Sequence, residues 1–468
     1  MKNLTSILSA AAILLLPLSL QAADKEKSSK AEAVKEHLES HVQVHGFIRN
    51  YFAFDTRQSV SGTGDLFYYV PKDVKMNEDG TEDLYAQSQF RFLALTSRLW
   101  VDVNGYRIAN TDIAAKIEAD FYCGLTDSKG TAQFRLRQAY VTLGWQQKKT
   151  RESLKIGQAW HPMAADMPDI FSLNTGAPFG PFSRTPVAQF DASFGKHFGL
   201  TAAAIWEMQY CSAGPEGISA NYMKYGCTPE FYFGVNVNAG GFLGRLGLDV
   251  HSIKPRITDT QKILDEETGK EIAITRKVKE RLTTISPFFY AQYKTKFGKV
   301  PFSVKAKTVY AQAGEHVNLN GGYGVSAMNE DGSWEYTPTR NSSTWVSLSV
   351  GKKFQGVLFG GYVKNFGTAK PLIDDKGHAG YSSSLYFSGN SFSNMNQMWR
   401  LTPTFMYNLG KFTVGLEYEL TSVQYGKYYK YKEGEKTVSC VNSSNGLATE
   451  DLHWVTNHRV QAMVKFTF

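Results

Sequence analysis

The sequence predicts an all-β fold, a transmembrane antiparallel β-barrel of about sixteen strands. Three observations predict it. The chain ends on RVQAMVKFTF, where apolar side chains occupy every second position from Val460 to Phe468 and mostly polar ones lie between them. The first residues have the composition of an export signal. The chain also combines 30 Phe and 25 Tyr with 20% charged residues, which suits a sheet with one apolar aromatic face and one wet face.

Residues 1–22 are predicted to be a secretory signal peptide. Lys2 precedes an apolar stretch from Ile7 to Leu20, and small residues follow at Ala22 and Ala23. No later segment approaches the ~18 apolar residues that a membrane helix needs. We therefore expect an exported protein without a helical anchor, localised to the bacterial outer membrane.

Residues 23–41 form a charged, helix-prone periplasmic segment. Ala31, Val34 and Leu38 are spaced three and four residues apart, the beginning of a heptad pattern. The segment is therefore either a solvated tail or a short coiled coil that joins subunits.

From residue 42 to residue 468 the pattern is that of strands, which form the barrel domain. Nearly all are close to or above the ~9–11 residues that a tilted strand needs to cross a bilayer. The predicted strands are 42–55, 89–103, 111–122, 133–145, 153–160, 187–194, 199–210, 230–237, 242–252, 279–295, 301–313, 342–354, 356–366, 396–407, 411–425 and 452–468.

The links between these strands alternate in length. Short turns follow the even-numbered strands and longer polar links follow the odd-numbered ones, except for the short link 123–132. This arrangement places both termini in the periplasm. Because lipid cannot hydrogen-bond an open edge, the last strand must pair with the first. Phe468 at the rim resembles the terminal signal read by the barrel-assembly machinery.

Alternation also assigns charged side chains to the lumen, since a charge facing lipid at mid-depth costs ~2–4 kcal/mol. In 111–122 and 411–425 the acidic residues Glu118, Asp120, Glu417 and Glu419 point inward. The inward basic residues are Arg98, Lys116, Arg135, Arg137, Lys155, Lys305, Lys307, Arg400 and Arg459. They are either wall charges held in ion pairs or an electrostatic filter that concentrates anions. Arg135 and Arg137 lie ~7 Å apart on one face. Each guanidinium group can bind a carboxylate through two N–H donors, so the pair could hold both ends of a small diacid.

The link 161–186 differs from the others because it is rich in Pro, Gly and Phe. Such a segment can fold into the lumen and narrow it, and a surface loop packed on its own aromatic rings is the alternative. Its charges are Asp166, Asp169 and Arg184. If the two aspartates face the basic wall, they create a transverse field across the pore.

Four cysteines in an exported protein suggest disulfides. Cys211 and Cys227 bracket one long link and are predicted to be joined, whereas pairing of Cys123 with Cys440 stays open. His37, His41 and His45 recur every four residues, but a polar tail explains them better than a metal site. The sequence contains no catalytic constellation, so we expect no enzyme, no cofactor and no metal. Scattered Lys and Arg also argue against nucleic-acid binding.

Four segments resemble the DcaP-like porins: HGFIRNYFAFDTR (45–57), TSRLWVDVNG (96–105), FRLRQAYVTLG (134–144) and LKIGQAWHPM (154–163). These porins are trimeric, sixteen-stranded outer-membrane channels for dicarboxylates and related anions, and some carry an N-terminal coiled coil. The resemblance implies that Arg135 and Arg137 line a constriction, that the protein is a homotrimer, and that small anions diffuse through it. The short tail departs from the family pattern. A surface adhesin or partner-binding barrel with Tyr-rich loops, such as 425–434, is the alternative function.

Overall fold

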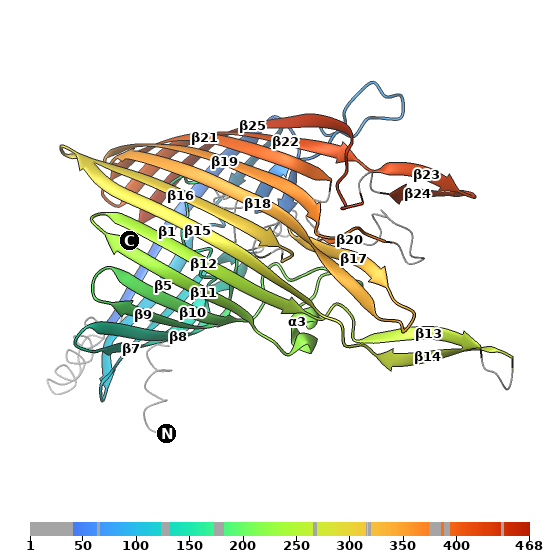
Figure 1. Ribbon diagram of the computed structural model, residues 1–468. Helices are drawn as coiled ribbons and strands as arrows, with labels where there is room; N and C mark the ends of the chain where they lie inside the picture. The colour runs from blue at the N-terminus through green and yellow to red at the C-terminus, as the bar shows by residue number, and fades with distance from the viewer. Residues whose placement is uncertain are drawn as a thin grey trace, which may run out of the picture.

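Sixteen strands close into an antiparallel barrel in the computed structural model (Figure 1), as the sequence predicts. The structure describes residues 41–62, 66–122, 132–172, 182–264, 269–314, 316, 320–373, 385–387, 394–440 and 444–468. The predicted signal peptide, nearly all of the periplasmic segment and Cys123 lie outside these ranges. No helix in the described part of the chain is long and apolar enough to span a membrane.

Every predicted strand has a counterpart in the barrel wall, and those at 42–55 and 111–122 keep their predicted ends. Two shorter strands, β4 and β5, together take the place of the second barrel strand, and they pair with successive parts of β1. The barrel strands are β1 (Val42–Asp55), β4 (Gln89–Leu93) with β5 (Arg98–Ile108), β6 (Thr111–Tyr122), β7 (Gln133–Gln146), β8 (Thr150–Trp160), β9 (Arg184–Phe194), β10 (Phe198–Ile205), β11 (Glu230–Ala239), β12 (Phe242–Ile253), β15 (Leu282–Phe297), β16 (Val300–Gln312), β18 (Trp334–Gly351), β19 (Phe354–Thr368), β21 (Met395–Leu409), β22 (Phe412–Lys427) and β25 (Glu450–Thr467).

Two predicted strands need correction. The strand predicted over 89–103 is broken between Leu93 and Arg98, where a turn forms because Ser97 donates its backbone N–H to the carbonyl of Ala94. The strand predicted over 199–210 ends at Ile205, because the chain leaves the wall shortly afterwards.

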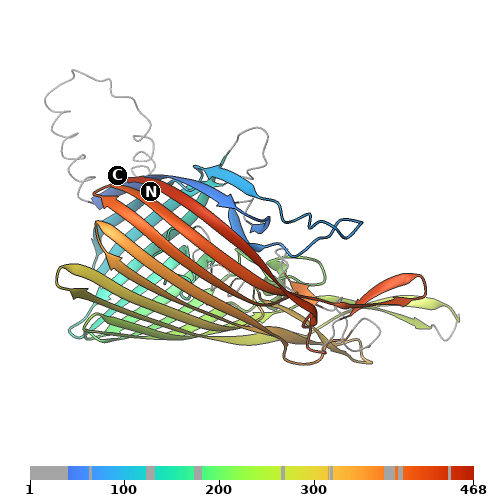
Figure 2. The same ribbon diagram turned by 90° about the horizontal axis from the view of Figure 1, so that it is seen from above.

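The last strand closes the barrel against the first. β25 pairs with β1 from Asp55↔Arg459 to Phe47↔Thr467, and Figure 2 shows the red strand beside the blue one. At the rim, the Phe468 N–H donates to the Gly46 carbonyl at 3.0 Å. A Cβ on Gly46 would lie 2.5 Å from the Phe468 ring, so only glycine allows this ring to cover the end of the seam.

The two faces of the wall have opposite composition, as predicted. On β22, Leu416 faces outward and is 58% exposed, whereas the adjacent Glu417 is 1% exposed. On β25, Val460 is exposed and Arg459 is buried. An apolar exterior with an ionic interior is the pattern of a barrel whose outer solvent is lipid.

Several long links contain strands that the sequence analysis did not predict. They are β2 (Ser59–Gly62) with β3 (Phe67–Pro71), β13 (Thr258–Leu264) with β14 (Glu271–Lys277), β17 (Gly322–Met328) with β20 (Leu385–Phe387), and β23 (Tyr429–Glu433) with β24 (Lys436–Cys440). A short helix, α3 (Asn221–Gly226), lies in the link after β10. The β13–β14 and β23–β24 hairpins extend beyond the barrel at the end opposite the short turns (Figure 1).

The predicted disulfide between Cys211 and Cys227 is absent. The Cys211 sulfur lies 3.3 Å from the carbonyl oxygen of Met208. Cys227 follows α3 as its C-terminal cap, and its sulfur lies 3.6 Å from the Lys224 carbonyl. Each thiol is turned toward its own local backbone, so bracketing a link in sequence does not bring these sulfurs together.

Candidate functional site

The segment after β8 runs inside the barrel. The Tyr51 hydroxyl donates to the Phe171 carbonyl at 2.8 Å, and the Phe171 N–H donates to the Glu417 carboxylate at 3.1 Å. Ser172 donates to Glu419 at 3.0 Å. A Cβ on Gly415 would lie 2.7 Å from the Phe171 ring, so glycine leaves room for that ring against the wall. Residues 161–172 therefore contact the lumenal face of β1 and β22, the two neighbours of β25, and we call them the inner segment.

Basic residues of the opposite wall hold the middle of the inner segment. Lys305 donates to the Asp169 carboxylate at 2.6 Å and to the Met167 carbonyl at 3.2 Å. Lys307 donates to the Asp166 carbonyl at 3.0 Å. Both lysines lie on β16, so a single strand provides two charged anchors.

The strand β3 also lies inside the barrel, which the sequence did not indicate. Arg400 on β21 donates to the Tyr69 carbonyl, Arg459 donates to the Tyr68 carbonyl at 3.3 Å, and Tyr425 donates to the Pro71 carbonyl at 2.6 Å. These wall side chains satisfy backbone groups that would otherwise be buried without partners.

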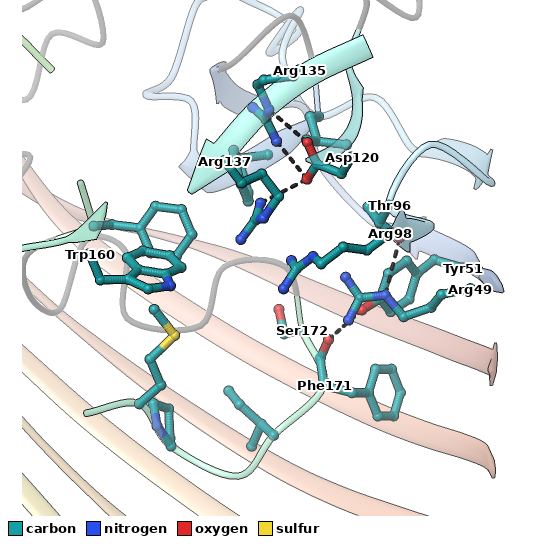
Figure 3. Close-up of a pocket in the computed structure, with 16 residues that line it drawn as sticks. Arg49, Tyr51, Thr96, Arg98, Asp120, Arg135, Arg137, Trp160, Phe171 and Ser172 are labelled. Atoms are coloured by element: carbon teal, nitrogen blue, oxygen red, sulfur yellow. Dashed lines mark hydrogen bonds and ion pairs between the residues drawn. The ribbon is translucent and has the colours of Figure 1, made fainter. Parts of the chain in front are cut away.

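A cavity of about 270 Å³ lies between the wall and these two internal elements (Figure 3). One side is lined by Arg49 of β1, Arg98 of β5, and Arg135 and Arg137 of β7. Figure 3 shows the four guanidinium groups converging from neighbouring strands. The other side is lined by Leu66, Phe67, Met167, Pro168, Ile170, Phe171, Ser172 and Phe182.

Two carboxylates of β6 hold the predicted arginine pair. Arg135 makes a two-pronged contact with Asp120 at 2.8 and 2.9 Å. Arg137 donates to Glu118 at 2.6 Å and to Asp120 at 2.7 Å. The register explains this contact, because Asp120 lies directly opposite Arg135 across the β6–β7 ladder. The bidentate pairing fixes the orientation of both guanidinium groups.

The other arginines have weaker anionic partners. Arg98 lies 3.6 Å from Glu118. Arg49 donates to the Thr96 hydroxyl at 3.1 Å and lies 4.9 Å above the Tyr51 ring. In the described part of the chain, no carboxylate is within ion-pair distance of Arg49. The turn between β4 and β5 thus contributes to the site, because it places the Thr96 hydroxyl beside the Arg49 guanidinium.

Arg184, the first residue of β9, is a fifth arginine near the four that line the cavity. It is 3% exposed, and its guanidinium lies 5.0 Å from the centre of the Trp160 ring. Two of its nitrogens, Nε and Nη1, are buried without a hydrogen-bond acceptor among the described residues. Five guanidinium groups and two carboxylates leave an excess of three positive charges around the cavity. The arginine cluster consists of Arg49, Arg98, Arg135, Arg137 and Arg184.

Sequence reasoning missed Arg49, although a signal was present. Arg49 falls on the same face of β1 as Tyr51 and Asp55. Ile48 and Phe52 lie on the other face and are exposed. Both faces of this strand carry large apolar or aromatic side chains, which hid the alternation.

Asp166 and Asp169 face basic residues of β12 and β16 rather than the arginine cluster, and the transverse field stays a prediction. Asp166 lies 3.2 Å from Arg245 on β12, and Asp169 lies 2.6 Å from Lys305 on β16. Their charges are already balanced by the wall they contact, because the inner segment crosses the lumen with its carboxylates toward that side.

The remaining predicted basic residues are distributed elsewhere in the lumen. Lys116 pairs with Asp102 at 3.0 Å, and Lys155 lies 5.3 Å from the Tyr140 ring centre. Arg400 and Arg459 secure β3 through its backbone carbonyls. The sequence-predicted set therefore divides into a cluster at the cavity, anchors for internal elements, and wall ion pairs.

Comparison with known proteins supports the fold. No family model and no curated protein matches the chain. The structure is similar to the crystal structure of the outer membrane channel DcaP of Acinetobacter baumannii, with a TM-score of 0.57 and 16% identity over 91% of this chain and 97% of that chain. The resemblance noted in the sequence is thus confirmed for the fold.

Weaker similarity extends to Salmonella typhi OmpF in complex with daunomycin, with a TM-score of 0.46 and 9% identity over 91% of this chain and 97% of that one. Pseudomonas putida OprB, in its high-pH structure, has a TM-score of 0.46 and 8% identity over 94% of this chain and 97% of that one. Similarity at this level carries no argument about the function of this chain.

Proposed function

We propose that this protein is an outer-membrane porin, a passive diffusion channel that prefers small anionic solutes such as dicarboxylates. The observation that carries the proposal is the arginine cluster, with its excess of three positive charges beside the cavity. A basic cluster inside a low-dielectric wall focuses the electric field and raises the local concentration of anions.

The arrangement of the cluster favours carboxylates in particular. Arg49, Arg98 and the Arg135–Arg137 pair come from three nearby strands of the wall, β1, β5 and β7. Guanidinium groups bind carboxylates through two parallel N–H donors. Because Asp120 and Glu118 occupy only part of this donor set, a solute with two carboxylates can contact separate guanidinium groups.

We propose that the inner segment and β3 form the constriction. Porin barrels of sixteen strands otherwise leave an open aqueous channel. Two internal elements that border the same cavity bring a solute close to the arginine cluster, and short distances strengthen electrostatic selection.

The proposal includes the protein's surroundings. The apolar exterior suits outer-membrane lipid, and Phe468 at the rim suits recognition by the barrel-assembly machinery. Residues 1–22 act as the signal peptide, both termini are periplasmic, and three copies assemble, with 23–41 as the trimerisation element. No catalytic activity is proposed.

The direct test is the reversal potential of the purified protein in a planar bilayer under a KCl gradient. An anion-preferring channel gives a potential of the sign set by chloride, and liposomes swell faster in a C4 dicarboxylate salt than in a neutral sugar of similar size. A channel that prefers cations would contradict the anion filter. A protein that never conducts would instead favour the partner-binding barrel, in which the exposed β23–β24 hairpin is the contact surface.

Removing the β16 anchors should loosen the constriction. In a Lys305→Met, Lys307→Met variant the inner segment loses three hydrogen bonds from charged donors, each worth ~1.5–3 kcal/mol. We expect a higher single-channel conductance with larger current noise. Lys155→Met is the matched control, because it removes a lumenal lysine that has no contact with the inner segment in the described structure. Equal conductance in all three proteins would show that these anchors do not set the pore width.

A further inference from the structure

A second cluster of ionisable side chains lies apart from the arginine cluster. Three histidines and three carboxylates meet inside the barrel near the end opposite the short turns, which we call the outer end, and all six side chains are 0–3% exposed. They come from the links after β8, β10 and β16 and from the outer ends of β11 and β12. They are His161, Glu207, Glu230, Asp249, His251 and His316.

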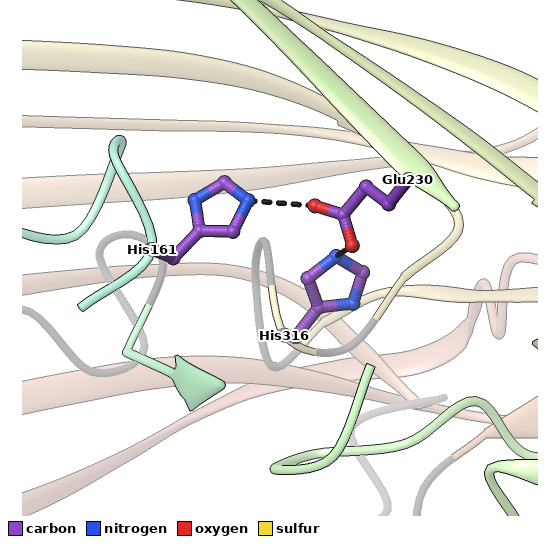
Figure 4. A group of neighbouring side chains, drawn as sticks. All are labelled: His161, Glu230 and His316. Atoms are coloured by element: carbon purple, nitrogen blue, oxygen red, sulfur yellow. Dashed lines mark hydrogen bonds and ion pairs between the residues drawn. The ribbon is translucent and has the colours of Figure 1, made fainter. Parts of the chain in front are cut away.

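Glu230 lies at the centre of this cluster (Figure 4). One of its oxygens is 2.6 Å from His161 Nε2, and the other is 3.0 Å from His316 Nε2. The donor atoms of these three residues all lie within 4.8 Å of one another. A metal with bonds of ~2.0–2.2 Å holds its ligand atoms ~3–3.5 Å apart, so small side-chain shifts suffice to enclose an ion.

Imidazoles pair with the buried carboxylates of this cluster, and several of these contacts have poor hydrogen-bond geometry. Among the described residues, no lysine or arginine is within ion-pair distance of Glu207, Glu230 or Asp249. Seven polar atoms are buried there without a hydrogen bond of good geometry: Glu207 Oε2, Glu230 Oε2, both oxygens of Asp249, His251 Nε2, and both ring nitrogens of His316. Burying polar atoms without well-formed hydrogen bonds costs free energy, and a divalent cation can supply the missing interactions.

We infer that His161, Glu230 and His316 bind a divalent transition-metal ion, with Asp249 as a fourth ligand. Asp249 Oδ1 lies 3.6 Å from His161 Nε2. Two imidazoles with carboxylates and no thiolate suit Zn²⁺ and its neighbours in the first transition row, whereas Ca²⁺ and Mg²⁺ prefer sites made entirely of oxygen.

Outer groups orient the ligands. Glu207 Oε1 lies 3.6 Å from His316 Nδ1, where it can accept the ring proton when Nε2 binds metal. Ser212 in turn donates to Glu207 at 2.9 Å. His161 Nδ1 accepts the Met163 N–H at 3.2 Å. Binding through His161 Nε2 requires the ring proton on Nδ1, so the Met163 N–H must give up this acceptor when the ion binds.

The position of the site gives the ion a structural role. His161 is the first residue of the inner segment, Glu230 begins β11, and His316 lies in the link after β16. A bound ion therefore ties the root of the inner segment to the wall and to an outer link. The complete burial of its ligands makes this a closed site without access for a reacting solute.

The test is uptake of Co²⁺ by the detergent-refolded protein. After chelator treatment and refolding with Co²⁺, we expect one bound ion per chain by elemental analysis, with visible absorption typical of nitrogen and oxygen ligands. Glu230→Gln and His316→Ala should each abolish this uptake. Glu207→Gln should weaken Co²⁺ binding about 10- to 100-fold, as loss of an outer-shell partner does.

His197→Ala is the matched control, because His197 is an exposed histidine in the turn between β9 and β10. It should bind Co²⁺ like the wild type. The shift of folded barrels on unheated gels shows which variants fold, and Glu230→Gln preserves side-chain shape. The inference is overturned if folded wild-type protein takes up no Co²⁺, or if folded Glu230→Gln binds as much as the control. Because uptake is measured in detergent, the result does not depend on whether the protein conducts.

Discussion

Replacing Arg135 and Arg137 together with alanine should lower the anion/cation permeability ratio by about tenfold. Two unit charges ~6 Å from a passing ion contribute ~0.7 kcal/mol each in a water-like dielectric, with opposite sign for anions and cations, which is ~2.8 kcal/mol in the ratio. Screening by salt removes roughly half of this, and the remaining ~1.4 kcal/mol corresponds to tenfold. The change also deprives Asp120 and Glu118 of their closest cations. Those carboxylates then attract cations at the cavity.

Reversal potentials in the same KCl gradient measure this effect. Arg107→Ala is the matched control, because Arg107 pairs with Asp112 near a short turn and its side chain is 61% exposed. It should leave the ratio unchanged. If the double variant folds and keeps the wild-type ratio, Arg135 and Arg137 are not the filter.

Replacing Arg459 with methionine should destabilise the barrel by about 3–5 kcal/mol, the usual cost of breaking a buried ion pair from one side. Arg459 contacts Asp55 at 2.7 Å and Glu419 at 2.9 Å, and all three side chains are at most 2% exposed. It lies opposite Asp55 in the ladder that closes the barrel. The substitution therefore leaves two buried carboxylates short of a cation at the seam.

Urea unfolding of the detergent-folded protein measures the loss. Adding Asp55→Asn to Arg459→Met removes one of the uncompensated charges and should recover part of the stability. A single variant as stable as the wild type, or a double variant less stable than the single one, would contradict the assigned role of this pair.

The strands were predictable from the sequence because each wall residue meets one of two solvents. The outward Leu416 and the inward Glu417 are adjacent, so a local pattern of period two contains the information. The turn between β4 and β5 was not predicted, because the hydrogen bond that it makes, from Arg49 to Thr96, involves a residue of another strand.

The interior was less predictable because its contacts join residues far apart in the chain. The bond from Phe171 to Glu417 spans 246 positions, and no local pattern indicates it. For the same reason alternation placed Arg135 in the lumen but gave no partner for Asp166, which contacts Arg245. The histidines of the second cluster lie at the ends of separate strands, so their spacing carries no ligand motif.

The seam between β1 and β25 also has a kinetic consequence. Asp55 and Arg459 are 404 positions apart, so their pairing closes a loop that contains most of the chain and carries an entropic cost. Until β25 pairs with it, β1 has an unpaired edge with which a strand of another chain could pair. The barrel therefore closes only when β25 pairs with β1. A polypeptide truncated before β25 should be degraded by periplasmic proteases.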